Sequence, residues 1–111
     1  MTNFEVQILG CGSALPTLQH LPSSQLIKLN GELFMIDCGE GAQLQMRKMN
    51  VRMSRLNTIF ISHLHGDHVF GLPGLISTYN LLNRTNDLTI YAHQEINPFL
   101  DPMLEIFCKD I

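Results

Sequence analysis

Three features that mark exported or membrane proteins are missing from this sequence. No apolar run approaches the ~20 residues that span a bilayer, and Met1–Glu5 shows neither the charged start nor the apolar stretch of a secretory signal. The three cysteines, Cys11, Cys38 and Cys108, are an odd and widely spaced set without a CxxC pair. Such a set argues against a disulfide framework. We therefore predict a protein of the reducing cytoplasm, without membrane association.

Positive charge is also scarce, since 7 Lys and Arg residues face 10 Asp and Glu residues and the formal net charge is −3. This balance argues against a generally basic nucleic-acid binder. Four basic residues nevertheless fall within nine positions: Arg47, Lys48, Arg52 and Arg55. The cluster predicts a solvated helix end and loop, with contact to phosphate groups as the alternative.

The length of 111 residues and the 45% hydrophobic content predict one domain with a buried core. Apolar runs and alternations predict five strands, over residues 4–9, 25–30, 33–37, 56–62 and 88–92. The pair Asn30–Gly31 predicts a hairpin between the second and third strands. The fourth strand has the continuous apolar centre expected of a strand that is buried on both faces.

Apolar residues at helical spacing predict three helices, over residues 42–49, from Pro73 onward, and from 98 to about 108. The residues expected on their buried sides are Leu44, Met46 and Met49 in the first helix, Leu75, Ile76, Tyr79 and Leu82 in the second, and Leu100, Met103, Leu104 and Phe107 in the third. Strands and helices mixed in this way predict an α/β layered architecture. A mixed sheet with helices on one side would leave an apolar face uncovered, so we expect residues 1–111 to form a single partial domain.

Metal-binding side chains are concentrated directly after the fourth predicted strand, at His63, His65, Asp67 and His68. Imidazole and carboxylate together suit first-row transition metals, so the segment predicts a hydrolytic metal site. In an extended segment, His63 and His65 project to the same side and can hold one ion. Gly66 lets the backbone turn, so that Asp67 and His68 point at a second ion. Two such ions about 3.5–4 Å apart can stabilise the attacking and leaving oxygens of a displacement, and Asp67 suits a general base.

Other candidate ligands are weaker. Asp37, at a strand end, either orients a ligand histidine through a hydrogen bond or caps the following helix or turn. His20 and His93 are lone histidines, for which a structural role is favoured. Cys11 and Cys38 are predicted to act as small buried hydrophobic residues rather than as metal ligands.

Together these residues resemble the metallo-β-lactamase superfamily, whose shared motif is His-x-His-x-Asp-His. More closely, the chain resembles the N-terminal part of the ribonuclease Z family of tRNA 3′-processing endonucleases. The matching segments are residues 9–13 with Pro16 and Thr17, residues 36–41, and residues 60–75. The last segment continues past the ligands as Val69-Phe70-Gly71-Leu72-Pro73-Gly74-Leu75, which is more specific to this family than the ligand motif alone.

The resemblance implies an αββα sandwich that binds two zinc ions, of which this chain holds the N-terminal half. It implies that His63 and His65 hold one zinc, that Asp67 and His68 hold the other, and that Asp67 is the general base. The implied reaction is attack of activated water on the phosphodiester 3′ of the discriminator nucleotide in precursor tRNA, leaving a 3′-hydroxyl on the tRNA. The implied assembly is a homodimer in which one subunit grips tRNA for the other.

The resemblance also implies substrate contacts in the early loop, at Pro16, Thr17, His20, Ser23 and Ser24. The family usually carries an arginine where His20 stands, and an imidazole is a weaker phosphate anchor than a guanidinium. Further zinc ligands come from the second half of the family's fold. We therefore expect a fragment with weak zinc binding and negligible activity by itself.

Two alternatives are kept beside this prediction. One is another hydrolase of the superfamily that acts on small phosphodiesters or thioesters, against which the extension from Gly71 to Leu75 argues. The other is a non-catalytic half-domain that folds by association, because large exposed apolar patches favour partners.

Overall fold

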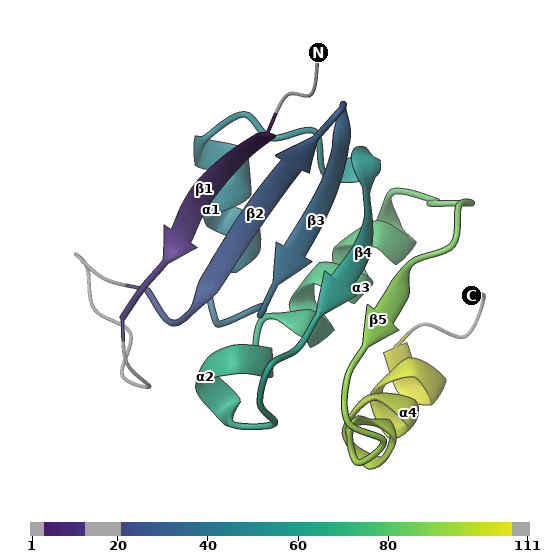
Figure 1. The fold of residues 1–111 in the computed structure, drawn as a ribbon. Helices are drawn as coiled ribbons and strands as arrows, with labels where there is room; N and C mark the ends of the chain where they lie inside the picture. The colour runs from purple at the N-terminus through teal and green to yellow at the C-terminus, as the bar shows by residue number, and fades with distance from the viewer. Residues whose placement is uncertain (1–3, 13–20, 108–111) are drawn as a thin grey trace.

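The structure of the chain, a computed structural model, describes residues 4–12 and 21–107, with Asp67 and Phe107 described by their backbone alone. One mixed sheet has the strand order β1-β2-β3-β4-β5, and the helices pack against one of its faces (Figure 1). The elements in chain order are β1 (Phe4–Gly10), β2 (Ser24–Leu29), β3 (Glu32–Ile36), α1 (Ala42–Lys48), the 3-10 helix η1 (Met53–Arg55), β4 (Leu56–Phe60), α2 (Gly66–Val69), α3 (Leu72–Leu81), β5 (Thr89–Tyr91) and α4 (Ile96–Phe107). The predicted fold class, α/β with a mixed sheet and helices on one side, is confirmed.

The turn between β2 and β3 consists of Asn30 and Gly31. Both residues have positive φ, 52° at Asn30 and 84° at Gly31. A two-residue hairpin turn needs this conformation to match the twist of its strands, and Asn followed by Gly adopts it at little cost. The predicted hairpin is therefore confirmed, and β1 extends it as an antiparallel neighbour of β2.

The last three strands run parallel, and this positions the candidate site. β3 pairs with β4 and β4 pairs with β5, each in parallel. The connections between them pass through α1 and η1, and then through α2 and α3, on the helical side of the sheet (Figure 1). The carboxyl ends of the three strands therefore lie together at one end of the sheet, where α2 also lies.

The core fills the space between the sheet and the helices. Leu26, Met35 and Ile59 from the sheet and Leu72 and Leu75 from α3 are all 0% exposed. None of the helices found in residues 4–12 and 21–107 has the length and apolar character needed to cross a bilayer.

The predicted buried sides of the helices need correction at three positions. Leu44 is 61% exposed and Met49 is 41% exposed, whereas Ala42 and Met46, four residues apart, face the core of α1. Leu44 lies two positions from each of them and thus on the other side of this short helix. Leu82 is 63% exposed and lies one residue beyond the end of α3.

The prediction that β4 is buried on both faces is wrong. Leu56 and Ile59 are fully buried under the helices, but Phe60 is 41% exposed on the opposite face. There its ring stacks between the rings of Phe34 and Tyr91, with centroids 6.5 and 5.2 Å away. The continuous apolar run thus reflects an aromatic row on an open sheet face.

Cys38 carries a testable consequence of this packing. Burial, and next the negative charge of Asp37, raise the pKa of the Cys38 thiol from 9.0 to about 12. The folded state therefore favours the neutral thiol. This contribution to stability is complete below pH 9 and is lost as the pH rises toward 12, by about 1 kcal/mol per pH unit. Urea unfolding between pH 8 and 11 should show a steeper alkaline loss of stability in the wild type than in Cys38→Ala.

A second measurement checks the same burial. The prediction of a buried residue is confirmed for Cys38 and wrong for Cys11, which is exposed. Iodoacetamide at pH 8 should therefore label Cys11 and leave Cys38 unmodified until the protein unfolds. Labelling of Cys38 at the rate of Cys11 would contradict the buried, neutral thiol.

Candidate metal centre

The parallel pairing of β3 with β4 brings Asp37 beside Ser62. Ile36 and Phe60 are register partners at the carboxyl ends of the two strands. The Asp37 N–H donates to the Phe60 carbonyl oxygen at 2.7 Å, so the residue after β3 lies against the residues that follow β4. Two segments that are 25 residues apart in sequence thereby form one site.

The short helix α2 then carries His68 back toward β3. Its N-cap is His65, with an extended backbone, and the His68 N–H donates to the His65 carbonyl oxygen at 2.9 Å. The Cys38 N–H in turn donates to the His68 carbonyl oxygen at 2.8 Å. The sequence predicted a turn at Gly66 but neither this helix nor the end of β4 at Phe60, two residues earlier than expected.

Asp37 is a buried carboxylate surrounded by donors. It is 3% exposed, and its Oδ1 accepts the Ser62 N–H at 2.7 Å. The Ser62 hydroxyl donates to Oδ2 at 2.7 Å, and the Nδ1 of His68 lies 2.7 Å from the same oxygen. Asp37 also has a φ of 61°, a backbone conformation that is uncommon outside glycine. Residues in such conformations are often found at functional sites, where the surrounding structure holds them.

These bonds decide where the imidazole protons lie. A carboxylate only accepts, so the Nδ1 of His68 carries the proton in this bond, and in the neutral imidazole its Nε2 carries none. The single proton of the Ser62 hydroxyl goes to Asp37, so the Nδ1 of His63, at 3.1 Å from that hydroxyl, donates to it. In the neutral form of both rings the unprotonated nitrogen is then Nε2, the arrangement in which a histidine binds a metal while its other nitrogen donates.

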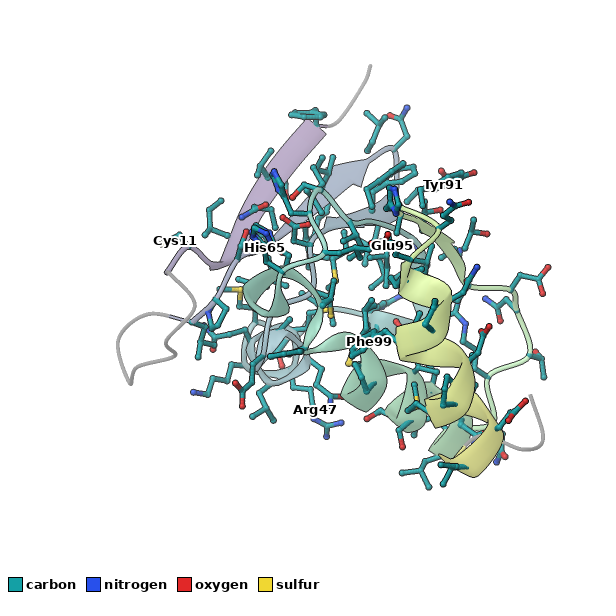
Figure 2. All side chains as sticks on the ribbon, turned by 90° about the horizontal axis from the view of Figure 1, so that it is seen from below. Cys11, Arg47, His65, Tyr91, Glu95 and Phe99 are labelled. Atoms are coloured by element: carbon teal, nitrogen blue, oxygen red, sulfur yellow. The ribbon has the colours of Figure 1, made fainter. Side chains whose placement is uncertain are left out.

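The three histidine rings form one cluster at the end of the sheet. Their centroids lie 5.9 Å apart for His63 and His65, 5.3 Å for His63 and His68, and 6.4 Å for His65 and His68. Figure 2 views the molecule from this end and labels His65 next to α2. No three His, Cys, Asp or Glu side chains of the described part come close enough to hold one ion by themselves. The donor chemistry therefore fits a transition metal, while the described donors do not close a site alone.

The structure describes the side chains of four of the five residues predicted for the metal site. His63, His65 and His68 lie together, and Asp37 contacts His68 rather than capping α1, whose N-cap is Gly41 without a side-chain bond. The side chain of Asp67 lies outside the described part. The assignment of these residues as ligands or as general base stays a prediction.

The predicted substrate contacts fall mostly beyond the described residues. Pro16, Thr17 and His20 lie outside them. Ser23 is half-buried and accepts the Gly39 N–H at its carbonyl oxygen, and Ser24 is fully buried at the start of β2. Their role in substrate binding stays a prediction.

Three residues near the cluster were given no site role from the sequence. Ser62 links His63 to Asp37, and its position directly before the first histidine is the signal that could have revealed it. His93 and Glu95 line a hollow of about 290 Å³ together with His63. Because β5 lies parallel beside β4, a histidine two residues after β5 comes to the same edge of the sheet.

The sheet, its one-sided helices and the histidine cluster define a protein of the metallo-β-lactamase fold. The crystal structure of human tRNase Z, short form, matches with a TM-score of 0.84 and 37% identity over 96% of this chain and 40% of that chain. The metallo-β-lactamase fold protein YhfI from Bacillus subtilis matches in fold, with a TM-score of 0.70 and 24% identity over 86% of this chain and 41% of that chain.

The chain belongs to the family described as anti-Pycsar protein Apyc1, whose family model matches residues 4–105. It is also 59% identical over all 111 residues to ribonuclease Z of Parabacteroides distasonis and 60% identical to ribonuclease Z of Bacteroides fragilis. The predicted resemblance to ribonuclease Z is thus confirmed. In both cases the chain spans 36% of the relative's length.

Proposed function

We propose that this chain forms part of a zinc-dependent endoribonuclease that removes the 3′ trailer of precursor tRNA. The observation that carries the proposal is the 59–60% identity to ribonuclease Z proteins along the whole chain. The cluster of His63, His65 and His68, held by Asp37 and Ser62, supports it chemically. In this proposal residues 1–111 are the N-terminal portion of the fold, and the remaining ligands come from outside them.

The proposed ligands divide between two zinc ions. His63 and His65 hold one, and Asp67 and His68 hold the other. When bound, zinc acts as a Lewis acid that makes water a better nucleophile at neutral pH and offsets the charge of the phosphodiester. Asp37 keeps His68 in the tautomer and orientation that ligation needs, and Ser62 does the same for His63.

Asp67 is the proposed general base. It accepts the proton of the attacking water as the water oxygen bonds to phosphorus and the bond between phosphorus and the tRNA 3′ oxygen breaks. That oxygen takes up a proton and becomes the 3′-hydroxyl of the tRNA, and the phosphate stays on the trailer. Substrate contacts from Pro16, Thr17, His20, Ser23 and Ser24 belong to the same proposal. The proposed assembly is a homodimer, and light scattering of the purified protein tests it. The proposed location is the cytoplasm.

Cleavage assays test the function. A protein of the relatives' length that carries this chain is incubated with a precursor tRNA and, separately, with bis(p-nitrophenyl) phosphate. We expect trailer removal that requires zinc, stops with a chelator, and falls by at least about 100-fold in Asp67→Ala. Residues 1–111 alone should show negligible turnover. Full trailer removal by the 111-residue chain, or by the Asp67→Ala protein, would contradict the assigned roles.

A second candidate is the hydrolysis of small phosphodiesters or thioesters. It is kept beside the first because the matching family model is described by an anti-Pycsar protein and its description names no nuclease. The hollow beside His63, about 290 Å³, is near the lower limit of small-ligand sites, roughly 300 Å³. Rapid hydrolysis of bis(p-nitrophenyl) phosphate without trailer removal would support this candidate against the first. If neither substrate is cleaved, the remaining candidate is a non-catalytic domain that acts through association.

A further inference from the structure

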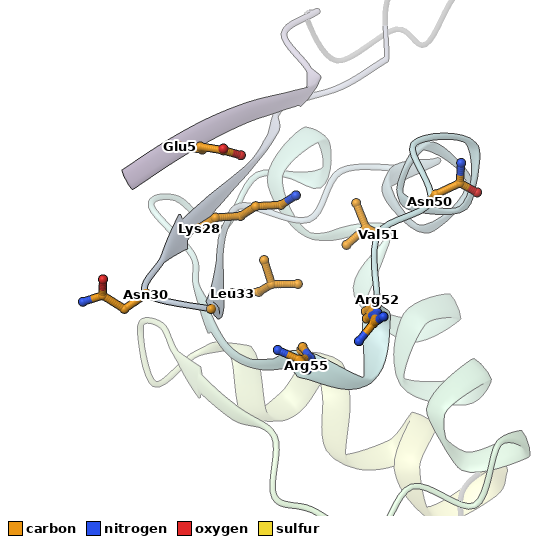
Figure 3. A pocket seen from close by; sticks show the side chains of 9 residues that line it. Glu5, Lys28, Asn30, Leu33, Asn50, Val51, Arg52 and Arg55 are labelled. Carbon is orange, nitrogen blue, oxygen red and sulfur yellow. The ribbon is translucent and has the colours of Figure 1, made fainter. Parts of the chain in front are cut away.

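A separate hollow is lined by residues of β1, β2, the β2–β3 turn, β3 and the segment before β4 (Figure 3). Its volume is about 410 Å³. Arg55, which lines it, directly precedes β4, whereas His63 follows the other end of the same strand. The largely extended segment from Arg55 to His63 separates these two residues by about 20 Å, so the hollow is not part of the candidate metal centre.

Positive charge dominates the lining. Lys28, Arg52 and Arg55 contribute three cations, against the single carboxylate of Glu5, although the whole chain has a net charge of −3. Glu5 faces Lys28 across the register of β1 and β2. Within the described residues, however, no ion pair below 4 Å involves Lys28, Arg52 or Arg55, and these three cations outnumber the one carboxylate of the lining. Cations gathered in this way repel one another until an anion binds.

The cations come from different elements that surround an apolar floor. Lys28 extends from β2 into the hollow, and Arg52 and Arg55 come from the segment before β4 (Figure 3). Leu33 is buried at the floor and Val51 is half-buried at the side. The Nη1 of Arg55 lies 4.0 Å from the position that a Cβ would take on Gly31, so its guanidinium rests near the β2–β3 turn. Small-ligand sites commonly combine such apolar walls with a few converging polar groups.

We propose that this hollow binds a phosphate group, with Arg52, Arg55 and Lys28 as its donors. A guanidinium presents paired N–H groups that match phosphate oxygens, and an ammonium adds a compact charge. The volume is large enough for the phosphate together with the group that carries it, either the nucleoside of a mononucleotide or the neighbouring residues of an RNA strand. The proposal uses none of the histidine cluster, so it stands or falls independently of the hydrolytic function.

Two double variants with the same change of charge provide the test. R52A/R55A removes two donors from the hollow. R47A/K48A removes two exposed cations from the last turn of α1, outside the hollow. The unchanged chain and both variants are titrated by calorimetry with inorganic phosphate and with adenosine monophosphate, and by fluorescence anisotropy with a short single-stranded RNA. Circular dichroism and the midpoint of urea unfolding check that each variant is folded.

We expect R52A/R55A to weaken phosphate binding by about 10-fold and R47A/K48A to weaken it by less than about 2-fold. If the natural phosphate belongs to RNA, the RNA binds more tightly than the mononucleotide, and R52A/R55A lowers its salt slope by about 1 to 2. If it belongs to a mononucleotide, adenosine monophosphate binds at least as tightly as the RNA. Equal weakening by the two variants, or no binding of any probe to the unchanged chain, would overturn the proposal.

Discussion

Replacing Asp37 by asparagine is expected to weaken zinc binding by about 10- to 100-fold while the fold is retained. The asparagine carbonyl oxygen can still accept the Ser62 N–H, which bonds Oδ1 at 2.7 Å. The asparagine amide, however, would donate toward the Nδ1 of His68. His68 would then carry its proton on Nε2, the nitrogen that the proposed metal site requires without a proton. Asparagine also tolerates the positive φ of 61° at this position.

Asp37→Ala is the variant to compare with Asp37→Asn, because it should lose both zinc binding and stability. It leaves the Ser62 N–H, the Ser62 hydroxyl and His68 without their acceptor in a site where Asp37 is 3% exposed. It also places alanine at positive φ. Together these effects should destabilise the fold by roughly 3–5 kcal/mol.

Competition with a chromophoric chelator measures zinc affinity, and urea unfolding with a chelator present measures stability without the metal. Zinc binding by Asp37→Asn as tight as that of the wild type would refute the tautomer argument. A loss of stability in Asp37→Asn as large as in Asp37→Ala would show that the charge of Asp37, and not its acceptor geometry, holds the segment.

Gly71→Ala is the other change with a large expected effect, a destabilisation of about 3 kcal/mol. A Cβ on Gly71 would overlap the Gly39 carbonyl oxygen and lie 2.9 Å from the Cys38 carbonyl oxygen. Both are backbone atoms, which cannot rotate away as the end of a side chain can. The Gly71 N–H also donates to the Cys38 carbonyl oxygen at 2.8 Å, so relief of the overlap would stretch this bond.

Gly74→Ala offers the control three residues further on. Gly74 lies inside α3, and a Cβ there would first meet the side-chain Nε2 of Gln43, at 3.1 Å. That flexible group can shift, and alanine favours a helix over glycine by roughly 0.5–1 kcal/mol. Urea midpoints should therefore fall for Gly71→Ala and stay equal or rise for Gly74→Ala. Similar losses in both variants would mean that tight contact with the Cys38–Gly39 backbone is not the cause.

Local chemistry explains which parts of the fold could be predicted from the sequence. The hairpin at Asn30–Gly31 follows from the conformational preferences of those two residues alone. The buried side of α1 could not be found with the same certainty, because a helix of seven residues carries few apolar positions. There the small Ala42 is buried and the larger Leu44 is exposed, so side-chain size misled the assignment.

The candidate site divides in the same way. The density of candidate ligands from His63 to His68 is visible in the sequence because those residues lie within six positions. The position of Asp37 depends on the register of β3 against β4, in which Ile36 faces Phe60. Only that pairing decides between a carboxylate that caps a helix and one that bonds to His68. The hollow lined by His93 likewise depends on β5 joining the edge of β4.

The strand order has a consequence for the synthesis of the protein. Because the order in the sheet equals the order in the chain, each strand pairs with the strand made just before it. Among the strands of residues 4–12 and 21–107, none has to wait for a distant partner to leave the ribosome, and such nearby pairings favour rapid, sequential folding. The bonds among Asp37, Ser62 and His68 can therefore form as soon as α2 has emerged, before β5 and α4 are complete. The histidine cluster can thus take shape during translation, with its ring protons already placed for the arrival of a metal ion.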